Sequence, residues 1–141
     1  MSKISFHSLK ATPLKNKTAL KNFLQQLFEQ ENKSLHQLTY IFCDDDYLLE
    51  INKNHLQHDY YTDIITFDLS ENDEDGTIGE LYLSIDRIRD NAKQMNQPLE
   101  RELHRVIFHG ALHLCGYKDK TDKEEKLMRE MEDKYLNQYL K

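Results

Sequence analysis

Residues 99–116 have the sequence LERELHRVIFHGALHLCG and carry the longest apolar periodicity of the chain. Apolar side chains recur there at the spacing that one face of an α-helix requires: Leu99, Leu103, Val106, Ile107 and Leu114. Pro98 suits the first position of this helix, because a missing backbone N–H costs nothing there. Gly116 suits the C-terminal end. We therefore predict one long helix that ends at Gly116.

The segments on either side predict a small sheet and further helices. β-rich runs indicate four strands, near Ile4–Phe6, Leu38–Cys43, Ile64–Leu69 and Ile78–Leu83. The last two form a predicted hairpin around Gly76. Further helices are predicted from the start signals Pro13, Asp44–Asp46, Ser84 and the capping box Thr121–Glu124. This order implies the α+β class, with a mixed four-stranded sheet packed with helices.

Length and composition narrow the class of protein. The 141 residues fit one domain, residues 1–141, and 38% apolar residues are enough for one core. No stretch approaches the roughly 20 apolar residues of a membrane span, and residues 1–6 lack the apolar centre of a signal peptide.

Cys43 and Cys115 are isolated thiols, so we expect a reduced, cytoplasmic protein without a disulfide. The net charge of −6 predicts no general attraction to nucleic acid, so an RNA substrate needs a local basic surface or a bound cation.

The long predicted helix carries a histidine pair that suggests a metal site. His109 and His113 are four residues apart, which places them about 40° apart on one helix face. By themselves, two exposed or capping histidines explain the pair equally well. Asp119 follows the helix break at Gly116 and is able to fold back as a third ligand. A reactive zinc site has three protein ligands and one position open to water, so the break and the carboxylate favour a metal site.

Zincin peptidases use the same histidine spacing and place a glutamate directly after the first histidine as general base. Gly110 occupies that position in this chain. The sequence therefore retains the two metal-binding histidines of that motif but lacks the general base for peptide hydrolysis.

Several motifs, in the same order along the chain, resemble the YbeY family of endoribonucleases. They are Ile51–Asn52 with His55, TDIITF at residues 62–67, GELYLS at residues 79–84 and HGALHLCGY at residues 109–117. The resemblance covers most of the chain. It implies a zincin-like fold, one divalent ion, cleavage of single-stranded RNA, and work on the 3′ end of small-subunit ribosomal RNA and in ribosome quality control. We therefore expect zinc as cofactor, a ribosomal RNA precursor and the small ribosomal subunit as partners, and neither membrane nor DNA.

Two positions depart from the family pattern. The family usually has a third histidine where this chain has Asp119, and a carboxylate ligand makes metal-bound water less acidic. The family also usually has an arginine, thought to meet the RNA phosphate, where this chain has Leu56. Lys53 and His58 are nearby alternatives for that role, although an ordinary surface position explains each of them too.

Other candidate residues have a structural and a functional interpretation. His104 points about 140° away from His109, so we expect no metal contact. Cys115 fits core packing better than a fourth ligand position, and Asp122 suits the first turn of the last helix. Glu80 is either a solvated strand residue or a group that orients water. Five basic residues are either solvated charges or a local RNA-binding surface: Arg87, Arg89, Lys93, Arg101 and Arg105.

Three functions follow as hypotheses. In the first, an ion held by His109, His113 and Asp119 polarises a phosphate or activates water, so that the two histidines act in RNA cleavage through the metal. The second is a metal-dependent hydrolase of another substrate such as a peptide, which Gly110 disfavours. The third is a non-catalytic ribosome-assembly factor with a structural metal. The metal-dependent endoribonuclease is the leading hypothesis.

Overall fold

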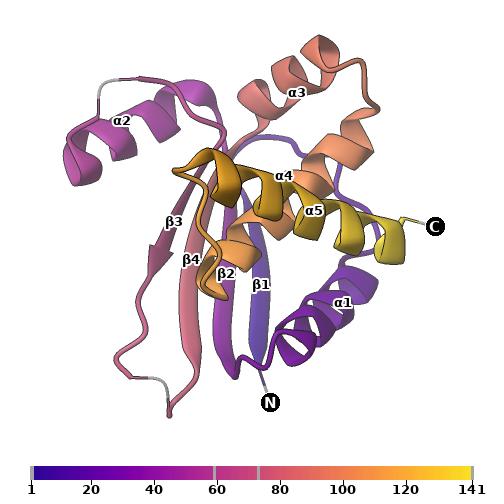
Figure 1. The fold of residues 1–141 in the computed structure, drawn as a ribbon. Coiled ribbons are helices and arrows are strands. Elements are labelled where there is room, and N and C mark those ends of the chain that lie inside the picture. Colours follow the sequence, from indigo (N-terminus) through magenta and orange to yellow (C-terminus); the bar gives the residue numbers. More distant parts are fainter. Residues whose placement is uncertain (1, 59, 73, 141) are drawn as a thin grey trace.

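The computed structural model describes residues 2–58, 60–72 and 74–140. This part of the chain forms four strands and five helices (Figure 1). In chain order they are β1 (Lys3–Ser8), α1 (Lys17–Gln30), β2 (Leu35–Cys43), α2 (Asp45–Leu56), β3 (Ile64–Asp68), β4 (Thr77–Ser84), α3 (Ile85–Gln94), α4 (Leu99–Leu114) and α5 (Asp122–Tyr139). Among the helices within these ranges, none is long and apolar enough to cross a membrane.

The strands form one mixed sheet in the order β1-β2-β4-β3. β1, β2 and β4 run parallel, whereas β3 pairs with β4 in antiparallel register, with Ile64 opposite Leu83. Parallel neighbours need a crossover, which α1 provides between β1 and β2, and α2 with β3 provides between β2 and β4. The predicted α+β class, the mixed four-stranded sheet and the hairpin are confirmed.

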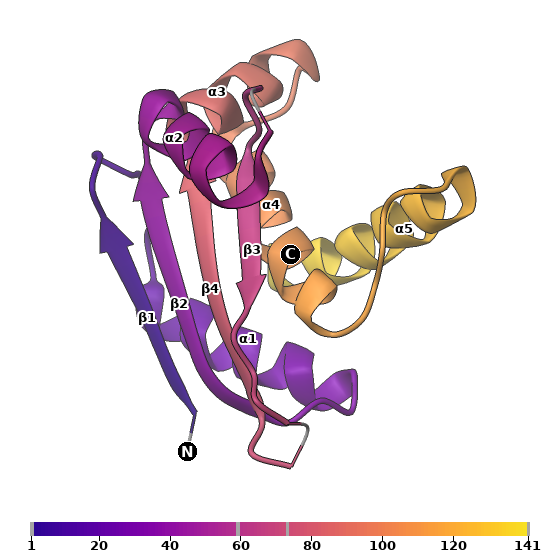
Figure 2. The same cartoon turned by 90° about the vertical axis from the view of Figure 1, so that its left-hand side faces the viewer.

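Helices α1 and α4 cover one face of the sheet, and α5 packs on α4 (Figure 2). The main core lies between these helices and the sheet, to which β2 contributes Leu38, Tyr40 and Phe42. The buried hydroxyl of Tyr40 donates a hydrogen bond to the carbonyl of Ile107 at 2.9 Å. This bond satisfies a polar group that burial would otherwise leave unpaired, and it ties α4 to the centre of the sheet.

A smaller apolar cluster lies on the opposite face of the sheet, beneath α2. It contains Cys43, Leu48 and Ile65. Cys115 belongs to the main core instead, so the two cysteines lie in different clusters. Both are buried and free.

Local signals account for the starts of α2 and α5, whereas α1 begins at Lys17, later than the start signal Pro13 predicts. Asp44 caps α2, because its carboxylate accepts a hydrogen bond from the backbone N–H of Tyr47 at 2.8 Å. Thr121 and Glu124 form the predicted capping box at the start of α5. The strand β2 begins at Leu35, earlier than predicted, because pairing with β4 extends it beyond its apolar run.

Candidate metal centre

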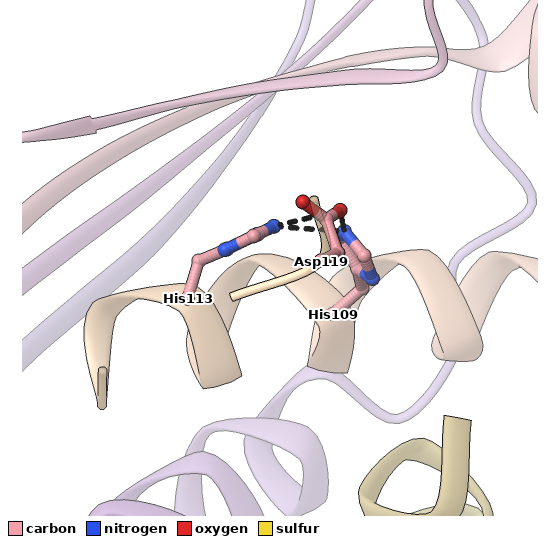
Figure 3. Close-up of side chains that lie close together, drawn as sticks. All are labelled: His109, His113 and Asp119. Carbon is pink, nitrogen blue, oxygen red and sulfur yellow. Dashed lines mark hydrogen bonds and ion pairs between the residues drawn. The ribbon is translucent and has the colours of Figure 1, made fainter. Parts of the chain in front are cut away.

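The three predicted ligands lie together at the C-terminal end of α4 (Figure 3). The Nε2 atoms of His109 and His113 are 3.0 Å apart. Each of these atoms lies 3.2 Å from Oδ2 of Asp119, which belongs to the segment between α4 and α5. Both histidines are half-buried, as is Asp119. The structure thus brings together all three residues that the sequence singles out.

The end of α4 explains how Asp119 returns to the histidines. Gly116 has a φ of 109°, a conformation that a residue with a Cβ rarely adopts. The N–H of Tyr117 closes the helix by donating to the carbonyl of Leu112 at 3.1 Å, as in a Schellman motif. The Tyr117 hydroxyl also donates to the carboxylate of Glu31 at the end of α1, at 2.8 Å. The chain is therefore reversed and held with Asp119 beside the helix.

Hydrogen bonds on the far side of each ring leave both Nε2 atoms as acceptors. Nδ1 of His113 lies 2.9 Å from the carbonyl oxygen of Tyr117, and Nδ1 of His109 lies 2.6 Å from Oε2 of Glu132. Carbonyl and carboxylate oxygens only accept, so the two Nδ1 atoms carry the protons. A neutral imidazole of this tautomer presents a lone pair at Nε2. Two lone pairs and the carboxylate oxygen of Asp119 therefore point at one another.

This arrangement fits a divalent ion in two respects. Tetrahedral zinc, with bonds of about 2.0–2.1 Å to nitrogen and oxygen, separates its ligand atoms by about 3.3 Å. The observed separations of 3.0 and 3.2 Å are close to that value. Three electron-rich atoms at this distance also repel one another unless a cation or a proton lies between them. Because three protein donors leave one tetrahedral position free, the set is that of an open, reactive site.

The cluster forms part of the wall of a cleft of about 580 Å³. Most of the rest of the wall comes from α2, from the segment before β3 and from β3 itself, and Leu114 and Lys120 complete it. Asp63, Asp68 and Asp119 contribute carboxylates to the described lining, and Lys120 contributes an ammonium group. Carboxylates therefore outnumber cations there, which disfavours a phosphate group in the absence of an ion.

Glu132 on α5 is a residue of this site that the sequence analysis did not predict. Burial opposes its ionisation, but the hydrogen bond from His109 and the charge of Arg105 lower the pKa of its carboxyl group below the usual value. A sequence signal for it existed. Glu132 lies four residues after Met128 and three before Tyr135, so an acidic residue falls within the buried face of the last helix.

Known proteins that are similar to this chain identify its family. Residues 4–140 match the family model described as Endoribonuclease YbeY. The chain belongs to the YbeY family. A protein of Flavobacterium psychrophilum named Endoribonuclease YbeY is 48% identical over 133 residues, which are 94% of each chain. One of the same name from Cytophaga hutchinsonii is 49% identical over 125 residues, 88% of this chain and 86% of that protein.

A solved structure supports the same assignment. The solution structure of a Thermotoga maritima protein is 32% identical in sequence and superposes with a TM-score of 0.58. The match covers 94% of this chain and 87% of that one. The YbeY resemblance that the motifs indicate, and the zincin-like α+β fold that it implies, are confirmed.

The position at which the YbeY family usually has an arginine lies in the wall of the cleft. Leu56, at this position, lines the cleft and is 41% exposed. His58 lines the same cleft, whereas Lys53 is not among the described residues of the lining. Lys120 is a cationic residue of the cleft that the sequence analysis did not consider. Of the two alternatives considered for the arginine's role, only His58 belongs to the described lining of this cleft.

Three other candidates of this YbeY protein lie outside the cluster of His109, His113 and Asp119. His104 is buried and packs against Tyr139. Cys115 is buried too, and burial raises the pKa of its thiol to about 12, so it remains protonated at neutral pH. Glu80 lies on the face of the sheet opposite α4, where it accepts a hydrogen bond from the hydroxyl of Tyr82. The sheet separates Glu80 from the histidines, so it is a strand residue and not a group that orients water.

The five basic residues before the motif do not form an RNA-binding surface at the cleft. Arg87 pairs with Asp45 at 3.0 Å, and Arg101 lies 4.0 Å from Asp133. Arg105 is mostly buried and pairs with two carboxylates. None of the five is among the described residues of the cleft lining. The five residues therefore do not line this cleft, although Arg105 lines a neighbouring pocket together with His109 and Asp119.

Gly110 allows α4 to approach the sheet closely. A Cβ at this position would lie 2.4 Å from Cδ2 of Leu81 and 2.7 Å from Cδ1 of Ile64. The position that holds the general base in zincin peptidases thus faces the packed core. This YbeY chain has no space there for a glutamate side chain.

Gly110→Glu should therefore lower the free energy of unfolding by about 3 kcal/mol or more, because it overpacks the core and buries an unpaired charge. Gly110→Ala, which adds only a methyl group, is the matched control and should cost less. Denaturant unfolding of the metal-free proteins, followed by circular dichroism, measures both. A Gly110→Glu protein as stable as the wild type would contradict the close approach.

Proposed function

We propose that this protein is a metal-dependent endoribonuclease whose active site is the cluster of His109, His113 and Asp119. The observation that carries the proposal is the convergence of three donor atoms, with one ligand position free, in the wall of a cleft. Relatives that align with nearly the whole chain are named endoribonucleases. The cofactor is one divalent ion per chain, and zinc is proposed because two imidazoles and one carboxylate at tetrahedral spacing suit it.

Each residue of the cluster has a defined task in this proposal. His109 and His113 would hold a divalent ion through Nε2, and Asp119 would hold it through Oδ2. When bound there, the ion would supply Lewis acidity for a phosphoryl oxygen or for a water molecule. The negative charge of Asp119 weakens this effect relative to a third imidazole. The carbonyl of Tyr117 orients the ring of His113.

The wall of the cleft suits a single strand of RNA. It carries His58 and Tyr60, whose ring centroids are 5.1 Å apart. Tyr60 is 52% exposed, and the buried side chain of Asn52 donates to its carbonyl at 2.8 Å, so the ring is presented on an anchored backbone. Unpaired bases stack on exposed aromatic rings, whereas the bases of a duplex stack on one another. Lys120 supplies a positive charge for a phosphate.

The finer parts of the proposal rest on membership of the YbeY family. The substrate is a precursor of small-subunit ribosomal RNA, processed at its 3′ end together with the small ribosomal subunit in the cytoplasm. The same activity serves ribosome quality control.

Residues 1–141 act as one domain, a proposal that the main core supports because it includes residues from β1 through α5.

Incubation of the purified protein with labelled single-stranded RNA tests the proposed activity. Cleavage should occur with protein that contains its ion, stop after chelation and return when zinc is added back. The same sequence as DNA and an unrelated peptide are the controls, and both should remain intact. RNA cleavage that persists after complete chelation would contradict metal dependence.

Tyr60→Ala should weaken the binding of single-stranded RNA by roughly 5- to 150-fold, because stacking of one base contributes about 1–3 kcal/mol. Tyr60→Phe retains the ring and should bind almost as tightly as the wild type. Fluorescence anisotropy in a His113→Ala background measures affinity without consuming the RNA.

Tyr61→Ala is the matched control for this effect. Tyr61 is adjacent and 50% exposed, but it is not among the described residues of the cleft lining. Its loss should leave affinity unchanged. An equal loss of affinity in Tyr60→Ala and Tyr61→Ala would show that the effect does not arise in the cleft.

A further inference from the structure

We propose that Glu132 is a positioning residue of the metal centre. Its carboxylate holds the proton of His109 on Nδ1 and so keeps Nε2 free to bind the ion. Histidines that bind metals commonly donate their second ring N–H to a carboxylate or a carbonyl. This inference rests on the proposed metal site, and it concerns the affinity of that site for its ion, not the cleavage of RNA.

The two oxygens of Glu132 have separate partners. Oε2 lies 2.6 Å from Nδ1 of His109. Oε1 lies 3.1 Å from Nη1 of Arg105 and 3.6 Å from Nη1 of Arg129. Arg105 is itself held on α4 by Glu102, whose Oε1 accepts from its Nε at 2.8 Å. The carboxylate of Glu132 is therefore aimed at the histidine ring by a second, buried ion pair.

The geometry selects one tautomer of His109. Glu132 is 2% exposed, so water does not readily replace His109 as the hydrogen-bond donor to its carboxylate. Loss of the hydrogen bond from His109 would leave a buried charge without this partner. In the other tautomer, Nδ1 would present a lone pair to the carboxylate, and two acceptors would face each other at 2.6 Å. The protein disfavours that state before any ion binds. The ligand atom of His109 is therefore preorganised, which should raise the affinity for the ion.

Zinc affinity, measured by competition with a chromogenic chelator, tests this role. Glu132→Gln preserves the size of the side chain but removes its charge, and we expect zinc binding to weaken by roughly 10- to 100-fold. Glu102→Gln is the matched control. Glu102 is 1% exposed and pairs with the same Arg105, but its hydrogen bonds go to that arginine and not to a histidine of the cluster. Glu102→Gln acts on the histidine only through Arg105, so it should weaken zinc binding much less than Glu132→Gln.

The outcomes separate this inference from the proposed function. Unchanged affinity in Glu132→Gln would overturn the inference, and so would an equal loss in Glu102→Gln, because the cause would then be the packing of Arg105. A wild-type protein that binds no zinc would overturn the metal site itself.

A second measurement decides the matter if Glu132→Gln does not fold. Nitrogen-15 NMR of the imidazoles in the metal-free wild-type protein reports the tautomer of His109 directly. A proton on Nδ1 is expected at a pH where the ring is neutral. A proton on Nε2 would overturn the role of Glu132.

Discussion

His113→Ala should abolish the metal-dependent cleavage of single-stranded RNA. The substitution removes one of three donor atoms and leaves His109 and Asp119, which are too few to hold an ion at an open site. The cleavage rate should fall by more than the roughly 10- to 100-fold that follows when a residue that only supports a metal-binding side chain is removed. Initial rates on labelled RNA, with the zinc content determined in the same samples, measure the effect.

His7→Ala is the control for His113→Ala. His7 is exposed on β1, and it is not among the described residues of the cleft lining, so its loss should leave the cleavage rate unchanged. Some RNA binding should survive in His113→Ala, because Tyr60 and Lys120 remain in the cleft. Cleavage by His113→Ala at the wild-type rate would point to a contaminating nuclease and would falsify the assignment of the ion as catalyst.

Asp119→Ala should weaken zinc binding by more than about 100-fold, a larger loss than removal of a supporting group causes. Oδ2 of Asp119 lies 3.2 Å from Nε2 of both histidines, and within the described residues no further carboxylate joins this cluster. Competition with a chelator measures the affinity.

Asp122→Ala is the control for the third ligand, because Asp122 is the next carboxylate along the chain. It is the first residue of α5, where its charge favours the helix N-terminus. Its loss should reduce stability by about 0.3–1 kcal/mol and leave zinc binding intact. Wild-type affinity in Asp119→Ala together with a loss in Asp122→Ala would identify Asp122 as the ligand.

Asp119→His distinguishes the ligand position from the ligand type. It should retain or tighten zinc binding, because imidazole suits zinc and restores the residue that is usual in the YbeY family. A strong loss of zinc in this variant, with the fold intact, would show that the segment after α4 cannot present an imidazole to the ion.

The sequence by itself determined the features that depend on near neighbours in the chain. The apolar spacing of residues 99–114 requires a helix, and within that helix the separation of His109 from His113 places both rings on one face. Gly116 and Asp119 follow within a few residues, so the return of the carboxylate to the helix is also a local event. The α+β class and the hairpin were predictable for the same reason, because helix periods, caps and turns act over short stretches.

Only the tertiary structure decided which distant residues meet at the site. Glu132 is 23 residues from His109 in sequence and contacts it because α5 packs on α4. Arg105 joins that network and is withdrawn from the surface on which the sequence allowed it to bind RNA. The face of the sheet that Glu80 occupies depends on strand register, since a shift of one residue exchanges the two faces. Apolar periodicity shows which side of an element is buried, but the partners of that side are set by the combined packing of elements distant in the chain.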